Sequence, residues 1–189
     1  MLKLYAADYR NTDERRAKCR PRSPQMGSAF GVSLLEYAVR DTWGIDLPEI
    51  SPPGGKPYFL HEPEKHFCIS HSKTHILVAL SDRPVGADVE TRREISEESR
   101  RMLMDDTEDE NFDFFQLWCL RESVFKLNGA GNLREILRFR KEDGRIIGPD
   151  PKIEYALIED VEGCAGAVCQ QGEFTMPELQ WVDIEKLCT

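Results

Sequence analysis

Two carboxylates lie two residues apart, Asp88 and Glu90, in the alternating segment Val-Gly-Ala-Asp-Val-Glu. Side chains at positions i and i+2 of a β-strand face the same side, so both carboxylates can reach one ion. Magnesium prefers oxygen ligands, and proteins usually supply one or two carboxylates to it beside phosphate oxygens and water. The pair is therefore a candidate metal site. Because Asp-x-Glu is a common sequence, a solvated strand end is the alternative interpretation.

A second charged set follows in an apolar helical segment. Trp118, Glu122 and Lys126 are spaced four residues apart, which places them on one face of a helix. The alternative is a surface pair between Glu122 and Lys126, worth about 0.3–0.5 kcal/mol. The apolar neighbours leave little polar surface on this helix, and they are Leu117, Leu120, Val124, Phe125 and Leu127. Since burying an unpaired charge is costly, a cation and a diphosphate are suitable partners for Glu122 and Lys126.

Two further segments carry residues suited to binding phosphate. Ser70, His71 and Ser72 follow a short apolar strand, and Lys56 lies in the rigid loop Gly-Lys-Pro. A Ser–His hydrolase is the rival interpretation of the first segment, but no G-x-S-x-G elbow surrounds either serine. An ordinary solvated side chain is the alternative for Lys56.

The overall charge argues against one class of partner. The 189 residues include 25 basic and 34 acidic side chains, a net charge of −9. A chain this acidic is not expected to bind nucleic acid through its overall field. Six basic residues nevertheless cluster near the N-terminus: Arg10, Arg15, Arg16, Lys18, Arg20 and Arg22. This basic arm is either a solvated segment or a binding surface for an acidic ligand.

Cysteine usage and hydropathy indicate a reducing compartment. The six cysteines form no C-x-x-C pair, and Cys68 and Cys119 lie in apolar runs where we expect them to be buried. The N-terminus has no apolar signal region, and no apolar run approaches the ~20 residues that span a bilayer. We therefore expect a cytoplasmic protein.

The periodicity predicts an α+β fold with antiparallel sheet. Helices are expected over 28–42, ending at Gly44, over part of 93–110, and over 111–127, ended by Gly129 and Gly131. Strands are expected over 1–8, 58–60, 66–69, 75–80, 85–90, 136–139, 145–147, 153–158 and 166–170. The strands over 75–80 and 85–90 flank a Ser-Asp-Arg-Pro turn, which predicts a hairpin.

Four motifs in order resemble a known family. They are Gly55-Lys56-Pro57, FCISHS at 67–72, PVGADVE at 84–90 and FFQLWCLRESVFKLNGAGN at 114–132. This set is similar to that of the 4′-phosphopantetheinyl transferases of the surfactin-synthetase-activating type. The resemblance extends from about residue 15 to residue 169. Each motif alone is modest, but four with matching intervals form a strong signal.

The resemblance implies a fold and a division of the chain. The family fold has two similar α+β lobes in a single chain, each a small, mostly antiparallel sheet packed on a long helix. The active site lies in the cleft between the lobes. Here the lobes would comprise residues 1–86 and 87–189, with the boundary near Gly86. We expect a monomer that binds neither nucleic acid nor a membrane.

The resemblance also implies a reaction. The family transfers the 4′-phosphopantetheine arm of coenzyme A to a serine of an apo acyl or peptidyl carrier protein and releases adenosine 3′,5′-bisphosphate. Such carriers serve fatty-acid, polyketide and nonribosomal-peptide synthesis. The cofactor is Mg²⁺, with Mn²⁺ as an alternative. The implied metal ligands are Asp88, Glu90 and Glu122; the diphosphate contact is Lys126; the other coenzyme A contacts are Lys56, Ser70 and His71. Glu122 also matches the proposed general base, and Arg15 to Arg22 would hold the 3′-phosphate.

The chain departs from the family pattern at several places. Arg121 stands where the family commonly has Lys, and Ala87 replaces a larger aliphatic residue. The regions before Ser28 and over 101–111 are shorter than in longer members. Two rival functions are compatible with the same residues: a metal-dependent phosphohydrolase with water as nucleophile, and a non-catalytic coenzyme A–binding protein. The intact Asp88, Glu90, Glu122 and Lys126 argue against the second rival.

Overall fold

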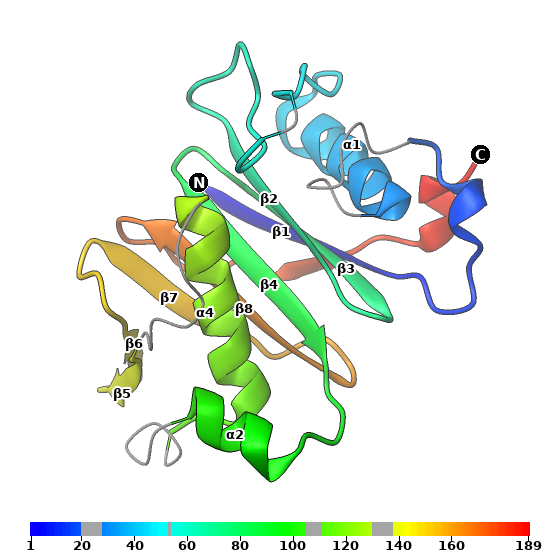
Figure 1. The fold of residues 1–189 in the computed structure, drawn as a ribbon. Helices are drawn as coiled ribbons and strands as arrows, with labels where there is room; N and C mark the ends of the chain where they lie inside the picture. Colours follow the sequence, from blue (N-terminus) through cyan, green and yellow to red (C-terminus); the bar gives the residue numbers. More distant parts are fainter. Residues whose placement is uncertain (20–27, 53, 105–110, 130–137) are drawn as a thin grey trace.

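The first sheet is built from short strands that carry apolar side chains on both faces. The computed structural model describes residues 1–19, 28–52, 54–104, 111–129 and 138–189. The strands of this sheet are β1 (Leu2–Asp8), β2 (His66–His71), β3 (His75–Ser81) and β9 (Leu179–Trp181), in the order β2-β3-β1-β9. β1 pairs antiparallel with β3 and parallel with β9. The C-terminal part of the chain therefore returns to the sheet that the N-terminus begins (Figure 1).

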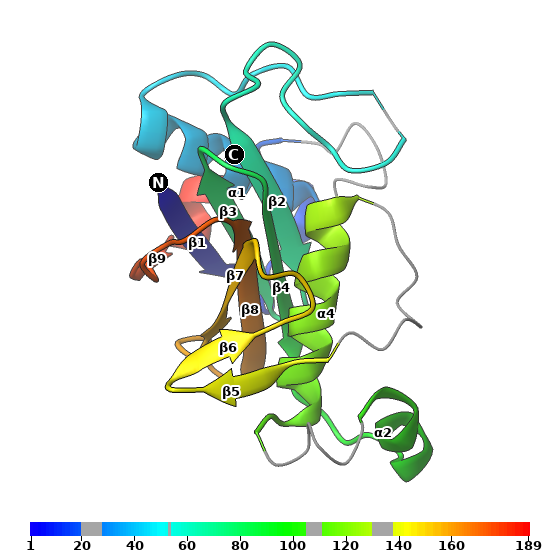
Figure 2. The ribbon, with the colours of Figure 1, turned by 90° about the vertical axis from the view of Figure 1, so that its left-hand side faces the viewer.

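The second sheet follows the order β4-β8-β7-β6-β5, and every pairing in it is antiparallel. Its strands are β4 (Val85–Thr91), β5 (Arg140–Glu142), β6 (Arg145–Ile147), β7 (Ile153–Ile158) and β8 (Cys164–Gln171). Figure 2 shows the long helix α4 (Phe114–Asn128) running along β4 and β8. The short helix α2 (Glu97–Leu103) contacts α4.

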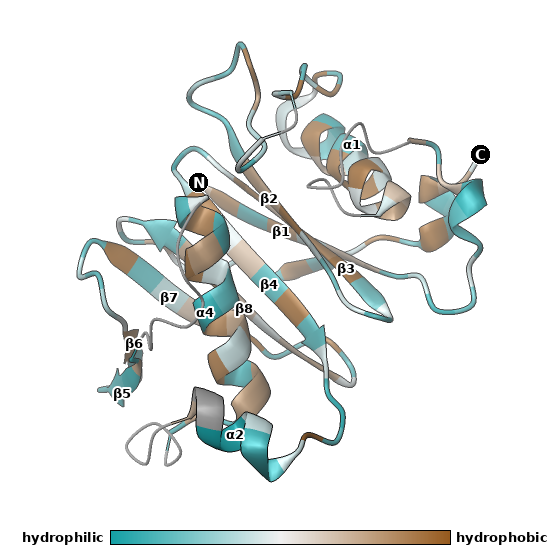
Figure 3. Cartoon of the chain, in the orientation of Figure 1, coloured by the Kyte–Doolittle hydropathy of each residue, from teal (hydrophilic) through white to brown (hydrophobic). Residues whose placement is uncertain are grey.

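Strand alternation divides the apolar side chains among three clusters. Tyr5 and Ala7 of β1 pack with α1 (Ala29–Trp43), whereas Leu4 and Ala6 pack between the two sheets. Apolar residues of β8 alternate in the same way, between the inter-sheet cluster and α4. The layers therefore follow the order α1, first sheet, second sheet, α4. In Figure 3 the hydrophobic residues concentrate in these layers, while α2 is hydrophilic. The expected α+β fold, with two sheets each packed against a helix, is confirmed.

Both long helices have defined ends. Ser28 caps α1 by accepting a hydrogen bond from the backbone N–H of Gly31, and α1 ends at Gly44 in the left-handed conformation. Asp113 and Gln116 form a capping box at the start of α4, which ends at Gly129. The predicted helix over 111–127 therefore begins three residues later, because Asp113 is the cap. Two 3₁₀ turns, η1 (Glu14–Arg16) and η3 (Ile184–Leu187), contact α1.

The predicted hairpin over 75–90 is wrong. β3 pairs with β1 on one edge and with β2 on the other, whereas β4 pairs with β8 in the second sheet. Because both edges of β3 are taken, the turn after β3 leads the chain from one sheet to the other. A pattern of alternation predicts a strand but does not name its partner.

The other strand predictions had mixed outcomes. The segment 58–60 forms no strand and contributes one isolated bridge, between Ile50 and Phe59. Of the predicted strand over 136–139, residues 136 and 137 lie outside the described part of the chain, and β5 begins after Phe139. β9 was not predicted. The lobe boundary near Gly86 stays a prediction. In the described residues, no helix has the length and apolar character needed to cross a membrane.

Gly86 sets how closely α4 approaches β4. A Cβ atom at this position would lie 1.9 Å from the backbone oxygen of Ser123 and 2.7 Å from the backbone nitrogen of Leu127. Both atoms belong to the backbone of α4, so they cannot move aside as a flexible side chain can. The absence of a side chain at Gly86 therefore allows the helix to lie directly on the strand.

We predict that Gly86→Ala lowers the free energy of unfolding by about 3 kcal/mol, because the added methyl group overpacks this contact. Gly163→Ala is the control, since its Cβ would meet nothing within 4 Å and only its positive φ opposes the change, at about 1 kcal/mol. Denaturant unfolding monitored by circular dichroism measures both. Equal losses in the two variants would contradict the close approach of α4.

Candidate active site

Three side chains from three elements meet beside the end of α4. Asp88 comes from β4, Ser70 from β2 and Lys126 from α4. The ammonium of Lys126 donates to Asp88 Oδ1 at 2.6 Å and to Ser70 Oγ at 2.8 Å. Ser70 Oγ donates to the same Asp88 oxygen at 2.8 Å. This cluster, Asp88–Ser70–Lys126, joins both sheets and α4.

The alternation of β4 explains why Asp88 reaches the helix. Val85, Ala87 and Val89 point into the cluster between the sheets. Because successive side chains on a strand face opposite sides, Asp88 and Glu90 point toward α4. Asp88 and Glu90 were predicted to face the same side of their strand, and that side faces α4, which carries Glu122 and Lys126.

The hydroxyl of Ser70 is saturated by protein partners. A hydroxyl has one donor and two acceptor positions. Ser70 donates to Asp88 and accepts from Lys126 and from the backbone N–H of Val89, at 3.2 Å. Its residue surface is 2% exposed. Ser70 therefore fixes the positions of Asp88 and Lys126 through hydrogen bonds from β2.

The second oxygen of Asp88 is unsatisfied. Oδ2 is buried and has no hydrogen-bond partner among the described residues, and Asp88 as a whole is 5% exposed. Leaving a buried acceptor unpaired costs about 1–3 kcal/mol, more when the group is charged. A carboxylate oxygen is the donor type that a hard cation binds. The site therefore fits a divalent metal ion at Asp88.

Glu90 and Glu122 lie near Asp88 without forming a closed set. Glu90 pairs with Arg93 at the surface, where their side chains are 25% and 51% exposed. Burial raises the pKa of Glu122, the charges of Asp88 and Glu90 raise it further, and Lys126 opposes them. Within the described ranges, no three His, Cys, Asp or Glu side chains are grouped tightly enough to hold a metal. The predicted triad is therefore not preassembled.

Lys126 stays protonated despite its surroundings. Burial by itself lowers the pKa of this lysine, but the charge of Asp88 and the hydrogen bond to it outweigh burial and raise the pKa above its usual value. An ammonium has three N–H donors, and the contacts to Ser70 and Asp88 use two of them. Among the described residues, neither the third donor of Lys126 nor Asp88 Oδ2 has a hydrogen-bond partner.

Lys56 has a structural position. Its ammonium donates to the backbone oxygens of Val85, at 2.7 Å, and Leu127, at 3.2 Å. Burial lowers the pKa of Lys56. This lysine ties the loop before β2 to β4 and to the last turn of α4, where Gly129 leaves room for its Cβ.

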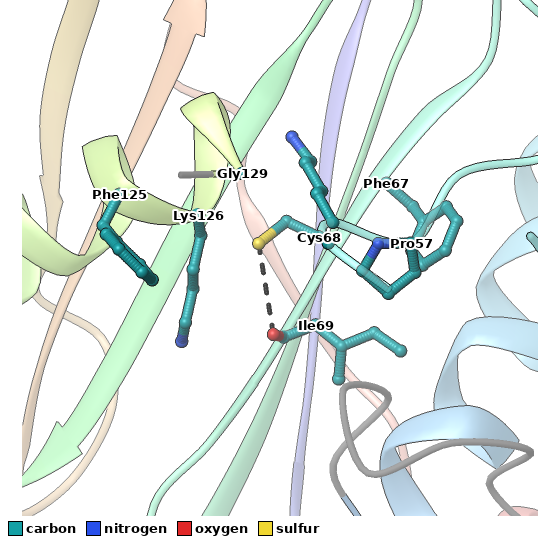
Figure 4. A pocket seen from close by; sticks show the side chains of 9 residues that line it. Pro57, Phe67, Cys68, Ile69, Phe125, Lys126 and Gly129 are labelled. Atoms are coloured by element: carbon teal, nitrogen blue, oxygen red, sulfur yellow. Dashed lines mark hydrogen bonds between the residues drawn. The ribbon is translucent and has the colours of Figure 1, made fainter. Parts of the chain in front are cut away.

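A pocket of about 310 Å³ opens between β2 and the end of α4 (Figure 4). Its walls come from the loop around Lys56, from β2 and from the last turn of α4. The lining residues are Gly55, Lys56, Pro57, Phe67, Cys68, Ile69, Phe125, Lys126 and Gly129. An elongated, partly apolar group can therefore lie beside the Lys126 ammonium.

The remaining predicted residues are spread around this centre. His71 is exposed at the end of β2. Arg15, with a side chain 88% exposed, pairs with Asp13, and Arg22 lies outside the described residues. Arg121 is buried in α4. Sequence reasoning missed Arg93, which carries no motif, and the contacts of Cys68 with the backbone of Ala87. The strand spacing of Cys68 and Ser70 is the signal that places both on one side of β2.

We predict that Asp88→Asn lowers the pKa of Lys126 and that of Glu122, because the Asp88 charge raises both. The wild-type Lys126 stabilises the fold at every pH below its unfolded pKa, and this contribution is lost as pH rises through the folded pKa. Wild-type stability should therefore fall more steeply than that of the variant above pH 10.5, the ordinary lysine value. At neutral pH the variant should lose about 2 kcal/mol.

Nuclear magnetic resonance titration of the Lys126 and Glu122 side chains measures the two pKa values, and unfolding at several pH values measures stability. Asp160→Asn is the matched control, since Asp160 is exposed on a loop. An unchanged Lys126 pKa in Asp88→Asn would contradict the cluster described above.

Comparison with known proteins agrees with the motif pattern. No family model matches the chain. A 4′-phosphopantetheinyl transferase of Bacillus subtilis is 30% identical over 152 residues, 70% of this chain and 68% of the relative. The transferase Sfp of Bacillus subtilis strain 168 is 30% identical over 134 residues, covering 62% and 60% of the two chains. The transferase psf-1 of Bacillus pumilus is 28% identical over 115 residues, covering 54% and 49%. These relatives are all enzymes of one kind, and the chain belongs to the family of 4′-phosphopantetheinyl transferases.

Proposed function

We propose that this protein transfers the 4′-phosphopantetheine arm of coenzyme A to a serine of an apo carrier protein. The observation that carries the proposal is the buried, unsatisfied Oδ2 of Asp88 beside the Lys126 ammonium. A coenzyme A diphosphate with its divalent cation satisfies both groups at once. Adenosine 3′,5′-bisphosphate is the leaving group. The family relationship supports the reaction class.

The cation, Mg²⁺ or Mn²⁺, would be held by Asp88, Glu90 and Glu122. When bound, it would polarise the diphosphate and neutralise charge on the leaving group. Glu90 must first release Arg93. That release costs little, because exposed ion pairs contribute about 0–1 kcal/mol. A bound cation would offset the mutual repulsion of the three carboxylates.

Lys126 holds the diphosphate through its remaining N–H. The serine oxygen forms a bond to the phosphorus on the pantetheine side as the bond from that phosphorus to the bridging oxygen breaks. Negative charge then accumulates on the 5′-phosphate of the leaving adenosine 3′,5′-bisphosphate, and a fixed ammonium stabilises that charge. Asp88 and Ser70 fix two of the Lys126 donors. Little further conformational entropy is therefore lost when the third donor binds the ligand.

Glu122 accepts the proton of the carrier serine, directly or through water. A serine hydroxyl is a weak nucleophile until a base takes its proton. The partly buried position that raises the pKa of Glu122 makes its carboxylate a stronger base than an exposed glutamate. One turn along α4 separates Glu122 from Lys126, so base and diphosphate contact lie on one helix face.

Of the remaining proposed coenzyme A contacts, Lys56 lines the pocket between β2 and α4. His71 at the exposed end of β2 and Arg15 of the basic arm would contact phosphate groups, with Arg22 beyond the described residues. Lys56 and Ser70 would support the site through the hydrogen bonds that they make within the protein. The pantetheine arm would extend from the diphosphate into the cleft between the two lobes. The acceptors are acyl or peptidyl carriers of fatty-acid, polyketide or nonribosomal-peptide synthesis, in the cytoplasm.

Intact-protein mass spectrometry tests the proposal. The protein is incubated with coenzyme A, Mg²⁺ and a panel of apo carriers. A metal-dependent gain of about 340 Da on a carrier, the mass of the phosphopantetheine arm, is expected. Cleavage of coenzyme A without a carrier would instead establish a phosphohydrolase, and coenzyme A binding without transfer to any carrier would overturn the catalytic assignment.

We predict that Glu122→Gln abolishes this transfer and keeps or raises stability at pH 7. The folded-state pKa of Glu122 is raised, so stability falls as pH rises through it, and the charged carboxylate destabilises the fold at neutral pH. Replacing that carboxylate by an amide removes the penalty. Carrier mass gain and thermal unfolding are measured together.

Glu159→Gln is the matched control for this variant, since Glu159 is exposed. It should retain full transfer and stability. A Glu122→Gln protein that transfers the arm at the wild-type rate, or that unfolds like a core deletion, would contradict the role of Glu122 as base.

A further inference from the structure

β4 is an edge strand whose free side faces the first sheet. Among the described strands it pairs with β8 alone, in the order β4-β8-β7-β6-β5. The backbone N–H of Gln171 in β8 donates to the oxygen of Pro84, so the groups of even-numbered residues face β8. Because backbone groups alternate along a strand, those of Val85, Ala87 and Val89 face the other way. An uncovered edge of this kind needs hydrogen-bond partners.

Three side chains supply these partners in register. Lys56 donates to the oxygen of Val85 at 2.7 Å. Cys68 accepts from the N–H of Ala87 at 3.3 Å, and its Sγ lies 3.5 Å from the Ala87 oxygen. Ser70 accepts from the N–H of Val89 at 3.2 Å. Side chains thus replace the backbone ladder that a neighbouring strand would provide.

We infer that Cys68 is a positioning residue for Asp88, acting through the backbone of Ala87. This inference rests on the proposed function, in which Asp88 holds the cation. Cys68 is 6% exposed, so water does not readily replace its contacts to Ala87. A thiol can both accept and donate, which matches the N–H and the oxygen that Ala87 presents. The peptide group next to Asp88 is therefore held by the first sheet.

Cys68 differs from the two residues beside it on this edge. Ser70 also bonds the Asp88 carboxylate, and Lys56 also bonds the end of α4. The hydrogen bonds of the Cys68 thiol go to backbone atoms, at Ala87 and, at 4.0 Å, at Ile69 (Figure 4), and its side chain packs in the cluster between the sheets. Changing Cys68 therefore removes hydrogen bonds to the backbone of β4 and none made by Asp88, while Lys126 shares the pocket wall with Cys68.

The test compares Cys68→Val, which has no polar atom, with Cys68→Ser, which keeps a donor and an acceptor. Amide hydrogen exchange at Ala87, read by nuclear magnetic resonance, reports the hydrogen bond. The Mg²⁺ concentration for half-maximal transfer reports the position of Asp88. In Cys68→Val, amide exchange at Ala87 should accelerate about tenfold, the change expected when one hydrogen bond is lost. The Mg²⁺ concentration for half-maximal transfer should rise several-fold. Cys68→Ser should stay within about twofold of wild type.

Cys188→Val removes another buried thiol, near α1, and should leave the Mg²⁺ requirement unchanged. If Cys68→Val does not fold, Cys68→Ala takes its place. Normal Ala87 exchange in the folded variant would overturn the hydrogen bond, and faster exchange with an unchanged Mg²⁺ requirement would overturn the positioning role. A wild-type protein that transfers nothing would refute the proposed function, whereas the exchange measurement judges the Cys68 contact independently.

Discussion

The hydrogen-bonded cluster of Asp88, Ser70 and Lys126 is the interaction on which the site depends. It places a carboxylate, a hydroxyl and an ammonium, all largely withdrawn from water, where two sheets and α4 meet. Removing one charged partner would leave the other as an uncompensated buried charge, which destabilises the fold. The cluster is nevertheless incomplete, because one Asp88 oxygen stays unpaired within the described structure. The hydrogen bonds of the cluster allow the chain to fold, and the unpaired oxygen favours binding of a polyphosphate together with a cation.

The fold supplies this arrangement by two close contacts. Gly86 lets α4 lie on β4, which brings Glu122 and Lys126 over Asp88. The free edge of β4 is covered by Lys56, Cys68 and Ser70, which fix the strand against the first sheet. Residues that could be taken for ligand contacts alone therefore also hold the framework.

Much of this could be predicted from local patterns. The spacing of Asp88 and Glu90, the helix face of Glu122 and Lys126, and the burial of Cys68 and Cys119 all follow from periodicity, as does the helix stop at Gly129. Pairing could not be predicted, because alternation in β3 and β4 is the same whether they form a hairpin or join different sheets. The saturated hydroxyl of Ser70 and the Glu90–Arg93 pair depend on tertiary contacts that no motif encodes.

In the proposed function, Asp88 offers its free oxygen to a cation that recruits the diphosphate. Calorimetric titration of coenzyme A into the wild-type protein, with Mg²⁺ and with a chelator, measures this coupling. We expect Mg²⁺ to strengthen binding at least about tenfold, equivalent to 1.4 kcal/mol. Equal affinity in the two conditions would contradict a metal site at Asp88.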